Sequence, residues 1–330
     1  MSRLNARLGD WDAVAKQSRW PALLVGNGMS MNVWSGFDYR RLYSVANLST
    51  EAESIFTAIG TKNFEAVLEG LWQTRTVLDA LGRRTSTIDR HYLEVREALL
   101  DAVTHVHPLP SQVPTAITRR IATTLDSYQS VYTLNYDLLP YWSLMEHRDD
   151  VRIADFFWSD GSTFDPDRTD LHAGWTGLFY LHGAVHLWHD VGTGTSGKWR
   201  SSSGGLLRGL AAKLSSAPER QPLFVSEGTA RHKRRTIRRS EYLSFAIQTL
   251  REEAEPLAIF GTSLGLPDAH VVSAINVHPQ RPLAIAVRPG TAEQIRRSKA
   301  RWHVAFPEQR LTFFMAETHP LGDPTLSVSP

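Results

Sequence analysis

The sequence contains no cysteine among its 330 residues. Disulfides, thiolate zinc sites, iron–sulfur clusters and a cysteine nucleophile are therefore excluded. A charge excess is also missing, because 36 Lys and Arg against 34 Asp and Glu give a formal net charge of +2. That balance is too small to steer the protein toward nucleic acid or a membrane. Residues 1–20 lack an apolar signal core, and no apolar run approaches the length that spans a bilayer. We expect a cytoplasmic protein that has no membrane contact.

The sequence does contain a series of short apolar runs that are typical of buried strands. These runs are 21–25, 131–134, 177–181, 221–225, 257–260, 282–287 and 311–315. Continuous rather than alternating apolar residues favour a parallel sheet covered on both faces. Helical stretches such as 240–253 and 291–304 lie between many of the runs. The sequence therefore predicts an α/β fold with a doubly wound, mostly parallel, Rossmann-like sheet.

Residues 38–127 interrupt this alternation with a segment that is predicted to be nearly all helix. Apolar residues recur there at the spacing of one helical stripe: Phe64, Val67, Leu68, Leu71 and Trp72. We expect residues 38–127 to form an inserted helical subdomain that acts as a lid. Residues 1–37 and 128–330 would then form the Rossmann-like domain.

Two glycine-containing turns follow predicted strands. The first is Gly26-Asn27-Gly28, followed by Ser30, and Met31 stands where a dinucleotide fingerprint has its third glycine. Glycine lets the backbone turn sharply and approach a phosphate, although an ordinary strand-to-helix turn also explains this pattern. The second turn is Gly261-Thr262-Ser263, with Asp268 after it. Its hydroxyls and amides suit a ribose or a phosphate, and helix capping by Ser263 or Asp268 is the alternative.

Polar side chains end two further strands. Asn135 and Asp137 follow the run 131–134, and Asp137 could instead cap the next helix. His182 ends the run 177–181 and is followed by glycine, so its imidazole suits proton transfer at neutral pH. Because His186 and His189 lie nearby in the sequence, a three-histidine zinc site is an alternative. The carboxyl ends of parallel strands share one edge of a sheet, so we expect the four clusters to converge on one site.

Taken in chain order, these motifs resemble the sirtuin-like NAD-binding family. The matching stretches are Gly-Asn-Gly-Met-Ser at 26–30, Thr-Leu-Asn-Tyr-Asp at 133–137, Leu-His-Gly at 181–183 and Phe-Gly-Thr-Ser-Leu at 260–264. Within that family, the chain is most similar to the bacterial branch of anti-phage defence that lacks zinc. The resemblance implies that NAD+ is the substrate and that the protein hydrolyses it, releasing nicotinamide and depleting the infected cell.

The resemblance also implies residue roles. His182 would be the general base, and Asn135 would orient a water or a ribose hydroxyl. The residues that would bind the dinucleotide are Gly26, Asn27, Gly28, Ser30, Asp137, Gly261, Thr262 and Ser263. Arg288 occupies the place where sirtuins have an asparagine that binds the adenosine ribose. No metal is implied.

One difference from the sirtuin-like family makes protein deacylation a less expected function. Deacylating sirtuins carry a zinc ribbon with four cysteines after the His-Gly motif, and this chain has no cysteine. NAD-dependent deacylation or ADP-ribosyl transfer is therefore a secondary hypothesis, and a third is a non-catalytic module that senses NAD or ADP-ribose. Because uncontrolled NAD+ hydrolysis is toxic, we expect gating by a homo-oligomer or by a regulatory partner protein.

The run 231–239 carries six Lys or Arg residues. It predicts either a solvated helix face or a surface for a partner or a nucleotide phosphate. Direct nucleic-acid binding is not expected, because aromatic residues are not interleaved with the basic ones and the rest of the chain is not basic.

Overall fold

The computed structural model describes residues 4–328 with several internal gaps. The gaps are 38–41, 63, 160, 171, 191–192, 201–205, 207–208, 210–212, 214–216, 218–219, 225–232, 235–236 and 239. Within the described residues, none of the helices is long and apolar enough to cross a membrane.

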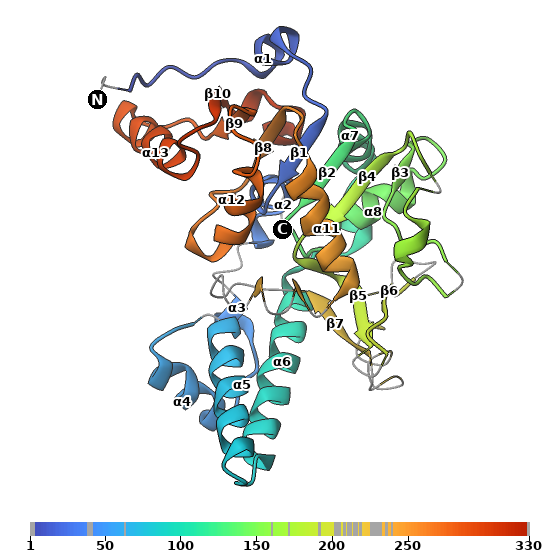
Figure 1. Cartoon of the computed structure of the whole chain (residues 1–330), viewed down its shortest axis with the longest axis vertical. Helices are drawn as coiled ribbons and strands as arrows, with labels where there is room; N and C mark the ends of the chain where they lie inside the picture. The colour runs from blue at the N-terminus through green and yellow to red at the C-terminus, as the bar shows by residue number, and fades with distance from the viewer. Residues whose placement is uncertain are drawn as a thin grey trace.

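A seven-stranded sheet forms the centre of the molecule (Figure 1). Its strands are β1 Ala22–Val25, β2 Ser130–Thr133, β3 Ile153–Ala154, β4 Thr176–Tyr180, β8 Leu257–Phe260, β9 Pro282–Val287 and β10 Arg310–Met315. The order across the sheet is β10-β9-β8-β1-β2-β4-β3, and every neighbouring pair is parallel. All residues of β1, β4 and β8 are buried, which explains their continuous apolar runs. The predicted doubly wound, Rossmann-like α/β fold is confirmed.

Helices pack around this sheet and share its core. They are α1 Trp11–Gln17, α2 Gly28–Val33, α7 Thr115–Asp126, α8 Leu139–Glu146, α11 Glu241–Glu252, α12 Ala269–Ile275 and α13 Ala292–Ala305. Short 3-10 helices connect several elements: η1 Ser35–Phe37, η3 Pro110–Gln112, η4 Pro166–Arg168, η5 Leu266–Asp268, η6 Ala316–Thr318, η7 Pro320–Gly322 and η8 Pro324–Leu326. Four of these helices pack into one apolar cluster with the strands. Their contributions include Met29 of α2, Ile121 of α7, Leu243 of α11 and Trp302 of α13.

The other helices form an insertion that projects away from the sheet in Figure 1. They are α3 Leu42–Val45, α4 Thr50–Ile59, α5 Phe64–Ala80 and α6 Ser86–Val106. Residues such as Phe56, Val67 and Leu99 build their own apolar cluster, which also contains Tyr136 and Tyr141. The insertion therefore packs against the chain that follows β2.

Helix α7 falls inside the predicted insertion of residues 38–127 but belongs to the sheet core. Ile117, Ile121 and Leu125 pack into the main cluster with the strands. The chain leaves the helical cluster near Val106, the last residue of α6, and returns to the sheet through α7.

The predicted strand 221–225 exists as β7 Arg220–Phe224, but not in the central sheet. It joins β5 Gly183–Asp190 and β6 Ser196–Lys198 in an antiparallel sheet of order β6-β5-β7. Gly183 starts β5 with φ of +69°, and a Cβ there would lie 2.0 Å from the Leu223 carbonyl oxygen. Only glycine fits this turn, which takes the chain out of the central sheet directly after His182.

Candidate functional site

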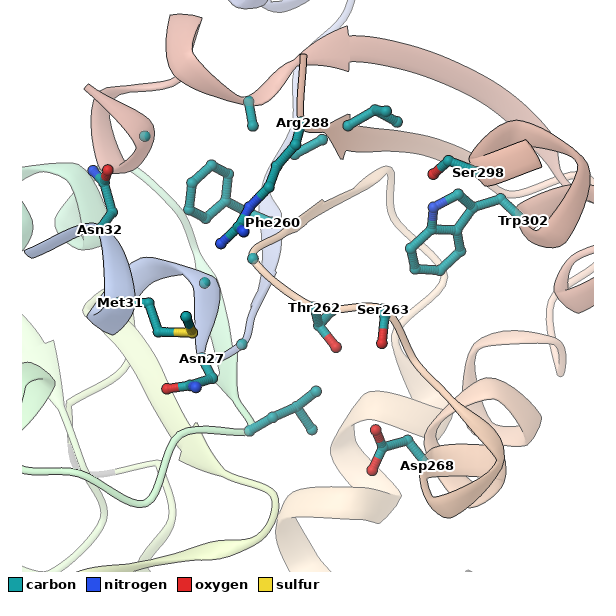
Figure 2. A pocket seen from close by; sticks show the side chains of 18 of the residues that line it. Asn27, Met31, Asn32, Phe260, Thr262, Ser263, Asp268, Arg288, Ser298 and Trp302 are labelled. Atoms are coloured by element: carbon teal, nitrogen blue, oxygen red, sulfur yellow. The ribbon is translucent and has the colours of Figure 1, made fainter. Parts of the chain in front are cut away.

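The main pocket lies at the point where the strand order of the sheet reverses. From β1, the chain continues on one side to β2 and later on the other side to β8. Ligands of open α/β sheets bind outside the carboxyl ends of the strands at such a point. The pocket there has a volume of about 880 Å³, within the range of about 300–1,000 Å³ that is common for ligand sites. Figure 2 shows part of its lining.

Two glycine turns meet at the floor of this pocket. The Gly28 amide donates to the Gly261 carbonyl at 2.6 Å, and the Gly26 amide donates to the Phe260 carbonyl at 2.9 Å. A Cβ on Gly28 would lie 2.7 Å from the Gly261 Cα, and Gly261 itself has φ of +70°. The glycines therefore bring the ends of β1 and β8 into backbone contact. Since both amides already have partners within the protein, these glycines contribute shape to the pocket.

Side chains around the turns provide polar groups. Figure 2 shows Thr262 and Ser263 with their hydroxyls directed toward the side of the pocket where Asp268 lies. The Nδ2 of Asn27 donates to the Phe37 carbonyl at 3.0 Å. Its buried Oδ1 has no hydrogen-bond partner among the described residues. The residues from both predicted turns that line the pocket are Gly26, Asn27, Gly28, Gly261, Thr262 and Ser263.

Ser30, Asn135 and Asp137 form a buried hydrogen-bonded group next to the pocket. The Ser30 Oγ donates to Asp137 Oδ2 at 2.6 Å and accepts from Asn135 Nδ2 at 2.8 Å. All three residues are at most 1% exposed. Leu134 and Tyr136 on either side of Asn135 line the pocket, whereas these three do not. The structure thus brings the three predicted residues together in the layer behind the pocket lining.

The remaining side-chain oxygens of this group, Asp137 Oδ1 and Asn135 Oδ1, differ in their hydrogen bonding. Asp137 Oδ1 accepts from the Leu139 amide at 2.9 Å, so its bond to the first residue of α8 and its link to Ser30 coexist, although Leu138 is the N-cap residue of that helix. The Oδ1 of Asn135 is buried without a partner among the described residues. A buried amide oxygen without a partner is costly, and it is the group in this layer that is left to accept a hydrogen bond, although Asn135 itself does not line the pocket.

His182 follows β4, lines the pocket and is 3% exposed. Its Nε2 lies 3.0 Å from the Nε2 of His270, and 3.9 Å from Asp268 Oδ1. Burial lowers the pKa of His182 well below its usual 6.5, and Lys233 and His270 lower it further. The imidazole is therefore neutral at pH 7, with one of its ring nitrogens unprotonated.

The wall beside His182 contains a buried ion pair that the sequence did not predict. The Lys233 Nζ lies 3.0 Å from Asp268 Oδ1, and Lys233 is only 4% exposed. The prediction of a solvated helix face for 231–239 is thus wrong at Lys233, and residues 231–232, 235–236 and 239 lie outside the described part. Asp268 makes no side-chain capping bond to α12, so capping does not explain this carboxylate.

At its other end, the pocket is formed by β9, α13 and the chain after β10. Its lining there includes Arg288, Ser298, Arg301, Trp302 and Glu317. In Figure 2, Arg288 extends past Phe260 toward α2. The resemblance pointed to Arg288, but Ser298 and Arg301 were missed because no local pattern on α13 distinguishes them from surface residues. The lining contains three basic side chains, Lys233, Arg288 and Arg301, and two acidic ones, Asp268 and Glu317.

A comparison with family models found one match, to a domain of unknown function, DUF4917, over residues 23–321. The chain belongs to the DUF4917 family. A comparison with curated proteins found none that matches it. The DUF4917 match begins inside β1 and ends after β10, so it spans both glycine turns, His182 and all of the pocket lining except Gly322.

In this DUF4917 chain, the histidines of the alternative zinc site are not brought together. His186 is fully buried, with its ring stacked on Tyr141 at 4.3 Å and edge-on to Tyr180 at 5.2 Å. Neither of its ring nitrogens has a hydrogen-bond partner among the described residues. Across the described ranges, no group of three or more His, Asp or Glu side chains is placed to hold a metal ion.

Proposed function

We propose that this DUF4917 protein is an NAD+ hydrolase that releases nicotinamide. The observation that carries the proposal is the pocket at the β1–β8 reversal, because one cavity joins two glycine turns to a neutral histidine. An elongated ligand with a ribose at His182 would cross these turns and reach the basic side chains of Arg288 and Arg301. A dinucleotide has this length, and its diphosphate has the matching charge.

The reaction needs little acid assistance. Nicotinamide leaves as a neutral molecule from a cationic ring, and the ribose passes through an oxocarbenium-like state. The protein must hold the ribose and direct one water to the anomeric carbon. His182 would accept the proton of that water, and the free Oδ1 of Asn135 would orient the water or a ribose hydroxyl. General-base assistance contributes about 10²–10⁴-fold, and positioning in a closed pocket adds to it.

The anti-phage role follows from the resemblance to the defence branch of the sirtuin-like family. In that role the protein depletes cellular NAD+ when a regulatory partner or oligomerisation activates it. The helical insertion supports such gating, because its apolar cluster includes Tyr136, which also lines the pocket. A movement of α3 to α6 would be transmitted directly to the chain beside Asn135.

The test is incubation of the purified full-length protein with NAD+, alone and with an acetyl-lysine peptide, while nicotinamide, ADP-ribose and acyl transfer are followed. We expect nicotinamide and ADP-ribose in equal amounts without the peptide. His182→Ala and Asn135→Ala should each lower the rate at least about 100-fold with circular dichroism unchanged. His278→Ala is the matched control, because this partly exposed histidine contacts the Arg251 carbonyl and does not line the pocket.

Three outcomes would contradict the assignment. If both variants hydrolyse NAD+ at the wild-type rate, the site is wrong. Release that depends on the peptide would favour deacylation or group transfer. Tight binding of NAD+ without nicotinamide release, in infected-cell extract as well as in buffer, would favour a sensing module.

A further inference from the structure

The contact between His182 and His270 is a feature that the proposed function does not explain. The two residues are 88 positions apart in the sequence, and their Nε2 atoms lie 3.0 Å apart. His182 lines the pocket, whereas His270 does not and lies behind it, on α12. This is the arrangement of a proton-accepting group held by a second, buried group, which recurs in enzymes that use general bases.

A hydrogen bond between two Nε2 atoms requires that only one of them carries a proton. Both rings are buried, at 3% and 7% exposure, so two charged rings in contact would be strongly disfavoured. The other charged groups that face the pair are Lys233, Asp268 and Arg234. Lys233 is held at 3.0 Å by Asp268, and its ammonium group opposes a second positive charge on the rings.

We infer that His270 is a positioning residue for His182, with His182 Nε2–H donating to the unprotonated Nε2 of His270. This arrangement fixes the tautomer of His182 and leaves the lone pair on its Nδ1. The inference rests on the proposed function, since it makes His182 Nδ1 the atom that accepts the proton in NAD+ hydrolysis. His270 acts only through His182 and does not touch the substrate.

The oxygen of water forms a bond to the anomeric carbon of the ribose, and the bond from that carbon to nicotinamide breaks, with its electron pair going to the ring nitrogen. The proton lost by the water goes to His182 Nδ1. The resulting imidazolium keeps its Nε2–H bond to His270, with Asp268 Oδ1 3.9 Å from that nitrogen, and later releases the extra proton to solvent.

The first experiment does not depend on activity. Nitrogen-15 NMR of the full-length protein labelled at histidine should show, at pH 7, His182 protonated at Nε2 and His270 unprotonated at Nε2. His182→Gln and His270→Gln would assign the signals, and His278→Gln is the control. Two rings that titrate independently near pH 6.5, or the opposite tautomers, would overturn the inference even if NAD+ is not the substrate.

The second experiment measures kinetics. His270→Phe should lower kcat about 100-fold and His270→Gln about 10-fold, both with KM within about threefold, because a glutamine side-chain oxygen can still accept from His182. The acid limb of kcat/KM should move to lower pH in His270→Phe and stay close to that of the wild type in His270→Gln, because only the first variant loses the acceptor that stabilises the His182 imidazolium. Unchanged kcat and pH profile in both variants would contradict the positioning role. A wild-type protein that shows the predicted tautomers but leaves NAD+ intact would refute the proposed function alone.

Discussion

The hydroxyl of Ser30 lies 2.6 Å from Oδ2 of Asp137, and this contact joins two segments that are 107 residues apart. Ser30 belongs to α2, directly after β1, and Asp137 follows β2. Asn135 donates to the same hydroxyl at 2.8 Å. The orientation of Asn135, which the proposed reaction requires, therefore depends on a serine in helix α2.

Substitution of Ser30 by alanine should destabilise the protein. Ser30→Ala removes a buried hydroxyl that donates to Asp137 and accepts from Asn135, and the loss of such a buried hydrogen-bonding group costs about 1–3 kcal/mol in the free energy of unfolding. Urea unfolding followed by circular dichroism measures this. Ser54→Ala is the control, because this exposed hydroxyl only donates to the Thr50 carbonyl in its own helix, and it should change stability by less than about 0.5 kcal/mol. Equal effects of the two substitutions would contradict the linking role of Ser30.

Substitution of Gly28 should separate the two turns at the floor of the pocket. A Cβ at Gly28 would meet the Gly261 backbone at 2.7 Å. Backbone atoms cannot move aside as a flexible side chain can, so we expect Gly28→Ala to cost about 2–3 kcal/mol in the free energy of unfolding and to weaken binding of NAD+, the substrate proposed above.

Gly265→Ala is the matched control in the loop after β8. The nearest atom to its new Cβ would be Pro267 Cδ at 3.4 Å, an ordinary contact. Thermal unfolding should show a large loss of melting temperature for Gly28→Ala and little change for Gly265→Ala. If Gly28→Ala unfolds like wild type, the two turns do not make the backbone contact described here.

Acidification should destabilise the fold through buried histidines. His319 is 1% exposed and contacts the Tyr128 hydroxyl at 3.0 Å, and burial lowers its pKa from 6.5 to about 3. The unfolded chain therefore binds a proton that the folded chain does not between these two values. Stability is complete above pH 6.5 and falls as the pH drops toward 3, by about 1.4 kcal/mol per pH unit for each such group.

The measurement is urea unfolding at a series of pH values from 7 to 4. His319→Gln should reduce the slope of stability against pH by about 1.4 kcal/mol per unit below pH 6.5. A His319→Gln slope equal to that of wild type would mean that His319 titrates alike in the folded and unfolded chains.

The fold was predictable from the sequence where strands are buried on both faces. The apolar runs 257–260 and 282–287 coincide with β8 and β9, because full burial imposes an apolar side chain at nearly every position. The strand 221–225 was also predicted but assigned to the wrong sheet. Its pairing with β5 depends on the turn at Gly183, and an apolar run carries no information about its pairing partner.

The candidate site was predictable where a strand ends in an unusual residue. Asn135 and His182 have no packing reason to follow buried strands, and this distinguished them. His270 and Lys233 carry no such signal: the first lies inside a short helix and the second in a basic run that predicts a solvated surface. Both became recognisable only through their distances to His182 and Asp268.

The sequence by itself determined the α/β fold class and the residues that end the buried strands. Both can be read from the order of apolar and polar residues along the chain, because burial of a strand imposes apolar side chains locally. The tertiary structure decided which of those strand ends share a pocket. It also decided that His182 is buried there, that a lysine lies in the wall of the pocket and that a second histidine lies behind it. These properties depend on distances between segments far apart in the chain, and only the packed sheet fixes such distances.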